Sequence, residues 1–178
     1  SVRLAELVTK EFASRFDFAA LCDVHYYIFQ DVYEWAGKVR VINIEKSEPA
    51  LGGISIEYSD CFDIEKDTKI ILDRMEHCIW DKISIEEAAV TFSRYLAELW
   101  KVHPYREGNT RTVITFCSQF IESKGLYIDS DLFKDNAQYV RTALVAASAT
   151  FSDLGDKRKP EYLEKIVLDA LERRSEER

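Results

Sequence analysis

The sequence predicts an all-α protein, mainly helical, with one domain spanning residues 1–178. Three observations support this fold class. Apolar residues recur at helical spacing in several segments. Capping residues, glycines and prolines stand at the ends of these segments. The chain has 178 residues and 47% hydrophobic composition, which is enough for one sizeable core.

The helical pattern is clearest from Ser84 to Lys101, where Ser84 and Glu87 form a capping box before a continuous apolar face. A later helix begins at Asn109 and stops before Gly125, a residue that suits the end of a helix. Pro160 suits the first turn of the last helix. The expected helices cover residues 18–35, 60–77, 84–101, 109–124, 131–147 and 160–174.

One region departs from the helical pattern, between about residues 39 and 59. Ile42 and Ile44 alternate with polar residues, and so do Ile54 and Ile56. The segment KSEPALGG between them supplies proline and glycines for a turn. We therefore expect a small β-hairpin on the helical domain.

Composition limits the partners that we expect. Lysine and arginine number 24 against 32 aspartates and glutamates, so the formal net charge of −8 argues against a nucleic-acid partner. No apolar run is long enough to span a bilayer, and the first residues lack the order of a signal peptide. The four cysteines are scattered without metal-site spacing. These features favour a cytoplasmic protein with reduced thiols and no membrane partner.

The stretch from His103 to Thr112 lies between two predicted helices and has the composition of a phosphate-binding loop. Gly108 and Asn109 tolerate positive φ values, which let successive backbone N–H groups converge on one anion. The following helix directs its N-terminal N–H groups into the same space. Arg111 adds a positive charge in the first turn.

Two further groups of this stretch could carry chemistry. A histidine such as His103 can accept a proton near neutral pH. A carboxylate beside phosphates, here Glu107, is suited to bind Mg²⁺. A base, a metal ligand and an anion site together are what phosphoryl or nucleotidyl transfer requires. The alternative is a simple turn with a packing histidine, and spacing alone does not separate the two.

The motif HPYREGNTRT resembles that of the Fic family, whose fold is called Fido, H-x-F-x-[D/E]-G-N-G-R-x-x-R. The similarity extends from about residue 16 to 171. It implies a helical Fic fold in which residues 39–59 form a flap that aligns the target protein. It also implies a bacterial protein adenylyltransferase that moves AMP from Mg-ATP to a hydroxyl of that target.

The resemblance assigns roles to individual residues. His103 would be the general base, and Glu107 would bind Mg²⁺. Tyr139 would stack on the nucleotide base. The residues expected to contact the nucleotide phosphates are Gly108, Asn109, Thr110 and Arg111.

Two positions depart from the family motif. Thr110 replaces its second glycine, and Ile114 replaces its second arginine, which would grip the terminal phosphate. Two alternatives therefore stay open: transfer of another phosphate-linked group from a different donor, or a degenerate domain that only binds. The family's inhibitory helix motif has no suitably placed match, which leaves inhibition to a small, antitoxin-like protein or to another device.

Overall fold

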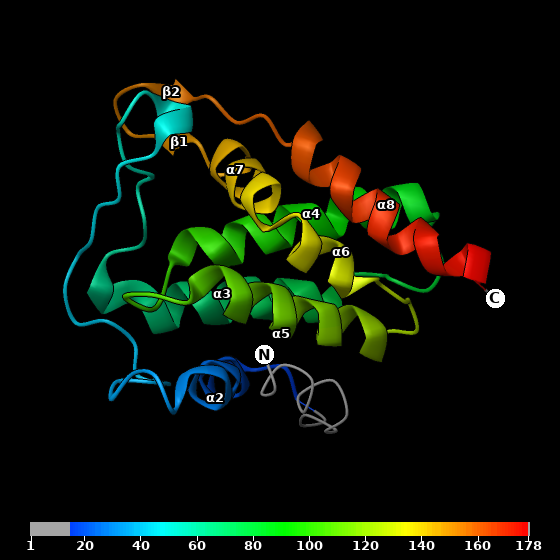
Figure 1. Ribbon diagram of the computed structural model, residues 1–178, viewed down its shortest axis with the longest axis horizontal. Helices are drawn as coiled ribbons and strands as arrows, with labels where there is room; N and C mark the ends of the chain where they lie inside the picture. The colour runs from blue at the N-terminus through cyan, green and yellow to red at the C-terminus, as the bar shows by residue number, and fades with distance from the viewer. Residues whose placement is uncertain (1–14, 178) are drawn as a thin grey trace.

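Helix α4 (Ile85–Val102) forms the centre of the fold in the computed structural model, which describes residues 15–177 (Figure 1). Ser84 caps it by accepting a hydrogen bond from the backbone N–H of Glu87 at 3.1 Å, as the capping box predicts. Leu99 and Trp100 at its C-terminal end are fully buried. The all-α prediction is confirmed.

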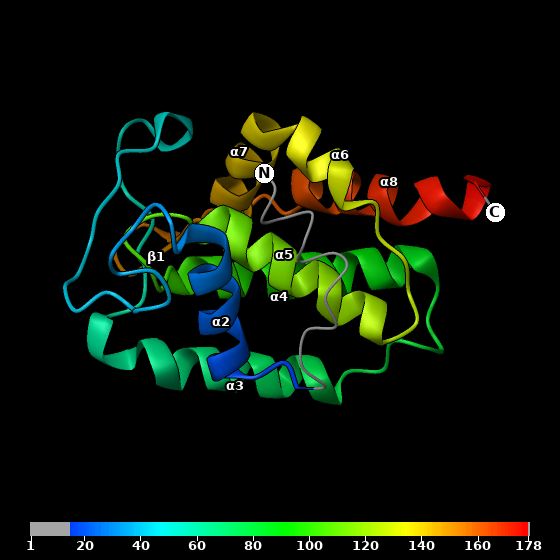
Figure 2. The ribbon, with the colours of Figure 1, turned by 60° about the horizontal axis from the view of Figure 1, so that its bottom comes forward.

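The remaining helices surround α4 (Figures 1 and 2). Helices α3, α5, α7 and α8 all pack against it, and α2 covers α5 and α3. Their bounds are α2 (Phe18–Phe29), α3 (Ile64–His77), α5 (Asn109–Ser123), α6 (Ser130–Asp135), α7 (Ala137–Ala147) and α8 (Glu161–Glu177). The 3₁₀ turns are η1 (Pro49–Leu51) and η2 (Cys61–Asp63).

Helix α2 is shorter than the predicted span of residues 18–35. After Phe29 the chain turns, with the N–H groups of Val32 and Tyr33 both donating to the Phe29 carbonyl. The turn brings the Gly37 N–H to His25 Nδ1 at 2.8 Å. Gly37 has a φ of 78°, and a Cβ there would lie 2.8 Å from Tyr26 Cβ. The chain after Phe29 must reverse direction for Gly37 to reach His25. A continued α2 would carry Gly37 away from His25.

The predicted helix over residues 131–147 is two helices, α6 and α7. They separate at Asn136, whose backbone leaves helical geometry at φ −122° and ψ 38°. The Asn136 side-chain amide donates to the Leu132 carbonyl at 2.8 Å. In a continuous helix that carbonyl would accept from the Asn136 N–H, so the side chain replaces the helical bond.

The predicted β-hairpin at residues 39–59 is wrong in its strands. This fully described segment doubles back at one end of the bundle, but it forms no strand ladder. Side chains take the groups that a ladder would use: Arg40 donates to the Ile42 and Ser59 carbonyls, and Ser55 Oγ accepts from the Lys46 N–H. Residues 39–59 are called the flap segment below.

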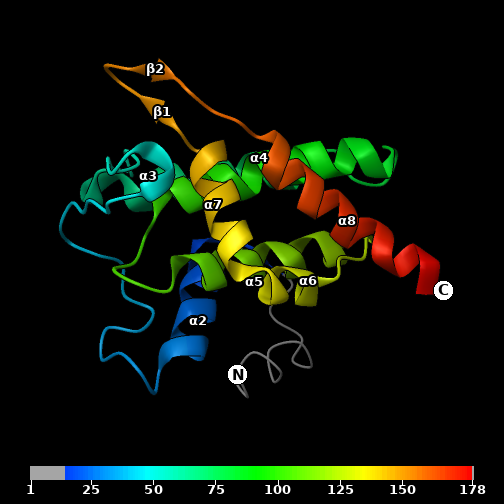
Figure 3. The same cartoon turned by 45° about the horizontal axis from the view of Figure 1, so that its top comes forward.

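The strands that do form lie at the edge of the bundle, between α7 and α8 (Figure 3). They are β1 (Thr150–Phe151) and β2 (Gly155–Asp156), paired antiparallel. No helix in residues 15–177 is both long and apolar enough to cross a membrane. All four cysteines are free thiols, as predicted.

Candidate active site

The loop from His103 to Gly108 connects α4 to α5 at the end of the bundle covered by the flap segment (Figure 1). His103 ends α4 with a φ of 51° and a ψ of 64°, in the left-handed region. Pro104 follows it and disfavours the right-handed helical conformation at the preceding residue. Arg40 of the flap segment donates to the His103 carbonyl at 2.8 Å. Its own N–H bonds to the Pro104 carbonyl at 2.9 Å, so both sides of the loop's start are held.

The His103 side chain has the form of a base. Its Nδ1 lies 3.1 Å from the Trp100 carbonyl oxygen. A carbonyl can only accept, so Nδ1 carries the proton and Nε2 presents a lone pair. Nε2 is buried and has no hydrogen-bond partner among the residues that the structure describes. The imidazole ring stacks on Tyr58 of the flap segment, with 4.1 Å between ring centroids.

The surroundings of His103 keep the imidazole neutral. Its pKa lies well below the ordinary value of 6.5, mainly because burial disfavours the charged form. The nearby cations Lys46, Arg141 and Arg40 lower the pKa further, in that order, while the bond to the Trp100 carbonyl opposes them. The residue is therefore ready to accept a proton across the neutral pH range.

Asn109 and His25 hold the loop in shape. The Asn109 side chain accepts from the Tyr105 N–H at 2.9 Å and donates to the Tyr105 carbonyl at 2.7 Å. The Asn109 side chain therefore shapes the loop, and its predicted contact with a nucleotide phosphate stays a prediction. His25 Nε2 donates to the Glu107 carbonyl at 3.0 Å because its Nδ1 accepts from Gly37. His25 is fully buried, so these two bonds give it a structural role in the loop.

The N-terminus of α5 has the geometry that could bind an anion. Gly108 precedes it with a φ of 84°, and a Cβ there would lie 2.4 Å from Phe29 Cε2, so only glycine fits. No side chain of the described residues caps this helix, which leaves the first-turn N–H groups available. Arg111 is exposed, with its guanidinium 5.6 Å from the centre of the Phe29 ring.

Glu107 lies at the outer side of the loop. Its side chain is 61% exposed, and its carboxylate is 3.7 Å from the Lys46 ammonium. No group of three metal-binding side chains occurs in the described residues. Mg²⁺ usually takes one or two carboxylates together with substrate phosphates and water. Glu107 therefore suits a Mg²⁺ ion that arrives with a nucleotide.

The two residues that depart from the family motif, Thr110 and Ile114, both lie on α5 and contact the rest of the protein. The Thr110 hydroxyl accepts a hydrogen bond from the Trp100 indole at 3.0 Å. Ile114, one turn later, is half-buried against the hydrophobic core. Thr110 thus ties the first turn of α5 to α4, and position 114 contributes no charge.

Tyr139 does not join this loop. It lies on α7 and donates its hydroxyl to the Tyr162 carbonyl of α8 at 3.1 Å. Arg141, two residues later, lies against Trp100. Residues two apart on a helix are about 200° apart around its axis, so Tyr139 faces away from the side that meets Trp100. The predicted stacking of Tyr139 on a nucleotide base stays a prediction.

Several residues of the site were missed by sequence reasoning. They come from the flap segment and from α7, and they are Arg40, Lys46, Glu48, Tyr58 and Arg141. None is part of a recognisable local motif. The alternating pattern of the flap segment indicated only its apolar residues. The contacts with the loop and with α7 are made by its charged residues.

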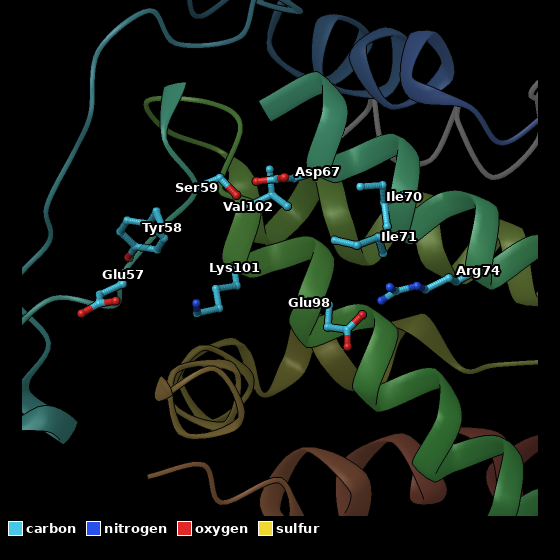
Figure 4. A pocket seen from close by; sticks show the side chains of 10 residues that line it. All are labelled: Glu57, Tyr58, Ser59, Asp67, Ile70, Ile71, Arg74, Glu98, Lys101 and Val102. Carbon is cyan, nitrogen blue, oxygen red and sulfur yellow. The ribbon is translucent and has the colours of Figure 1, made fainter. Parts of the chain in front are cut away.

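A groove of about 470 Å³ lies beside the site (Figure 4). Helices α3 and α4 form two of its walls, and Glu57, Tyr58 and Ser59 of the flap segment form the third. None of residues 103–112 lines it. Tyr58 therefore contacts both the groove and the His103 imidazole.

Comparison with known sequences identifies relatives. The Fic/DOC family model matches residues 15–121. The protein adenylyltransferase VbhT of Bartonella schoenbuchensis is 31% identical over 130 residues, covering 73% of this chain and 26% of VbhT. The probable protein adenylyltransferase y4lH of Sinorhizobium fredii is 33% identical over 117 residues, covering 64% of this chain and 56% of that protein. The match thus spans between about a quarter and just over half of the length of these relatives.

Solved structures share the fold. The N-terminal Fic domain of a cell filamentation protein from Bartonella quintana, which has bound ADP, aligns with a TM-score of 0.75 and 19% identity. The alignment covers 95% of this chain and 79% of that chain. BepC of Bartonella tribocorum, with bound AMPPNP, aligns with a TM-score of 0.73 and 17% identity, covering 95% of this chain and 80% of that chain.

Proposed function

Because the chain belongs to the Fic/DOC family, we propose that it is a protein adenylyltransferase, which transfers AMP from Mg-ATP to a hydroxyl side chain of a target protein. The observation that carries this proposal is the free Nε2 lone pair of neutral His103, beside the uncapped N-terminus of α5. A base next to an anion site is the arrangement that nucleotidyl transfer needs.

In the proposed reaction, His103 Nε2 takes the proton of the target hydroxyl. The hydroxyl oxygen forms a bond to the α-phosphorus of ATP, and the bond from that phosphorus to the bridging oxygen of pyrophosphate breaks. The proton stays on the imidazole, and the electron pair leaves with pyrophosphate. The N–H groups at the start of α5 would stabilise the charge on the phosphate oxygens.

Glu107 would hold Mg²⁺ together with the phosphates, and the ion would neutralise part of their charge. Its exposed carboxylate is free to do so once Lys46, 3.7 Å away, turns to another anion. Lys46 itself is then the nearest cation that could bind the nucleotide phosphates. Its pKa is lowered mainly by burial, and Glu107 opposes that shift.

The target would dock along the flap segment. Val41, Ile42 and Ile54 there are exposed apolar side chains, at 80%, 50% and 44% exposure. Main-chain pairing with an extended target segment would order this region further. Tyr58 must move aside for a target hydroxyl to reach His103, because its ring covers the imidazole.

A second candidate is the transfer of another phosphate-linked group. It is favoured by the two departures from the motif, Thr110 and Ile114, because α5 has no second arginine at position 114 to grip a terminal phosphate. Calorimetry with ATP, UTP, GTP and CDP-alcohols separates the two candidates by donor preference. Preference for ATP over the others would exclude this second candidate.

The leading proposal is tested by incubating the protein with α-labelled ATP and a lysate of its host. We expect labelled target protein with the wild type and none with His103→Ala. His77→Ala is the matched control, because the His77 side chain is 76% exposed and lies on α3. Equal labelling by His103→Ala would remove His103 as the base. Absence of transfer from any donor by the wild type would favour a binding module.

A further inference from the structure

A buried carboxylate pairs with an arginine beside the proposed active site. Glu48 Oε1 of the flap segment lies 2.6 Å from Arg141 Nη2 of α7. The Glu48 side chain is 6% exposed and the Arg141 side chain 36%. A carboxylate is withdrawn from water to this extent only when a cation compensates it. Glu48 is therefore held in place by Arg141, across 93 residues of sequence.

The backbone around Glu48 also sets its position. Its carbonyl accepts from the N–H groups of Leu51 at 3.0 Å and Gly53 at 2.9 Å, and its N–H donates to the Ile54 carbonyl. These bonds close the tip of the flap segment around η1, which contacts α7. The Glu48 carboxylate is thus positioned at the site by a hydrogen-bonded turn of the flap segment.

Arg141 lies next to the anion site at the start of α5. Its guanidinium carbon is 5.9 Å from the centre of the Trp100 ring. The same indole donates to Thr110 in the first turn of α5 and contacts the edge of the His103 ring, at 5.0 Å between centroids. Trp100 therefore brings together the arginine, the base and the helix N-terminus.

Two polar atoms beside this ion pair have no hydrogen-bond partner among residues 15–177. His103 Nε2 and the Tyr58 hydroxyl are both buried and make no hydrogen bond, although their rings stack at 4.1 Å. Glu48 and Arg141 both act electrostatically on the Tyr58 hydroxyl, so the ion pair is close to it. The Tyr58 hydroxyl can donate to an anion, whereas His103 Nε2 can only accept a hydrogen bond, so the two atoms suit a phosphate and a hydroxyl that meet there.

We propose that Arg141 binds the terminal phosphates of the donor nucleotide, and that the Glu48 carboxylate takes their place until the nucleotide displaces it. Position 114 of α5 is aliphatic, and Arg141 of α7 offers a second arginine beside this helix, in addition to Arg111. The arginine fork fits a phosphate as it fits a carboxylate, with paired N–H donors. The inference rests on the proposed function, in that it assigns a phosphate-binding residue to the same site.

The test measures nucleotide binding by calorimetry, with Mg-AMPPNP and with AMP as separate probes. Arg141→Ala should weaken Mg-AMPPNP binding about 10-fold or more, because a charge-assisted contact is lost. AMP lacks the terminal phosphates, so its affinity should stay within about 2-fold. Glu48→Gln keeps the side-chain shape and removes the charge, and we expect Mg-AMPPNP to bind several-fold more tightly.

Two further variants keep the result interpretable. Arg141→Ala leaves Glu48 without a partner, so the double variant Glu48→Gln/Arg141→Ala tests the arginine without a buried charge; its fold is checked by circular dichroism. Arg173→Ala is the matched control, because Arg173 also pairs with a carboxylate, Asp129, 3.8 Å away. It lies toward the C-terminal end of α8, away from the flap segment (Figure 1).

The outcomes are distinct. Unchanged Mg-AMPPNP affinity in the folded double variant, an equal loss for AMP, or no Mg-AMPPNP binding by the wild type would each overturn the role of Arg141. Failure of Glu48→Gln to tighten binding would overturn the role of Glu48. Binding that depends on Arg141 without transfer of label would uphold this inference and reject the proposed adenylyl transfer.

Discussion

The Arg40 guanidinium donates a hydrogen bond from Nε to the main-chain carbonyl of His103 at 2.8 Å. Its Nη2 also donates to the Val102 carbonyl at 3.2 Å and to Ser59 at 2.5 Å. One buried side chain, 3% exposed, therefore joins both ends of the flap segment to the residue proposed as the base. The flap segment and the active-site loop form one structural unit through this arginine.

Replacement of Arg40 is expected to destabilise the whole protein. Arg40→Ala leaves several buried carbonyls without a donor, and we expect the free energy of unfolding in urea to fall by about 3 kcal/mol. Arg40→Lys should recover only part of this, because an ammonium cannot reach the same set of acceptors. Arg74→Ala, at an exposed position on α3, is the control and should change stability by less than about 0.5 kcal/mol. An Arg40→Ala protein as stable as this control would contradict the assignment.

Stability should decrease as the pH falls below about 6.5, the ordinary pKa of histidine. The pKa of buried His103 is lowered in the folded protein, mainly by desolvation, so the unfolded chain binds the proton first. The pKa of His25 is lowered by burial as well. His103 alone contributes a slope of up to about 1.4 kcal/mol per pH unit in the free energy of unfolding.

Urea unfolding at pH 7.5, 6.5 and 5.5 measures this slope. His103→Gln should reduce the slope between pH 6.5 and 5.5, because its side chain binds no proton in either state. His77→Gln, which changes an exposed histidine on α3, is the control. A slope that is the same for the wild type and His103→Gln would show that His103 titrates alike in both states.

Two glycines with the same backbone conformation should differ in their tolerance of alanine. Gly108 has a φ of 84° and Gly125 a φ of 89°, but only Gly108 faces a ring, that of Phe29. Gly125→Ala should cost about 1 kcal/mol from the positive φ alone. Gly108→Ala should cost a further 1–3 kcal/mol, roughly, from steric overlap. Thermal or urea unfolding of the two variants gives the difference, and equal losses would place Phe29 elsewhere.

Transfer should depend on Mg²⁺ through Glu107. Glu107→Gln is expected to lower the rate of labelling with α-labelled ATP roughly 100-fold at saturating Mg²⁺, because the ion loses its protein ligand. Chelation with EDTA should abolish the wild-type reaction. Glu86→Gln removes one charge from an exposed position in the first turn of α4, at the other end of that helix from the loop, and serves as the control. Undiminished labelling by Glu107→Gln would exclude Glu107 as the ligand.

Local sequence signals predicted the parts of this protein that depend on neighbouring residues. The capping residue Ser84, the glycine at 125 and the apolar periodicity located α4 and α5 closely, because a helix is built from contacts three and four residues apart. The loop containing His103, Glu107 and Gly108 was recognisable for the same reason. Its residues are contiguous in the sequence, because the loop and the start of α5 lie in one short segment.

Prediction failed where a side chain competes with the backbone. Asn136 divides a helix whose apolar pattern continues through it, since one amide takes the Leu132 carbonyl. In the flap segment, Ser55 and Arg40 bind main-chain groups that alternation had assigned to a β ladder. Whether a side chain replaces a backbone hydrogen bond depends on which backbone groups lie within its hydrogen-bonding distance. The periodicity of apolar residues does not report these distances.

The sequence by itself determined the helical class and the position of the loop from His103 to Gly108, because these depend on short-range contacts. Only the tertiary structure decided what surrounds the His103 side chain. The ring of Tyr58 on His103, the Arg40 bonds across 63 residues and the Glu48 to Arg141 pair across 93 all join elements distant in the chain. Their energies arise from burial, which exists only after the helices have packed.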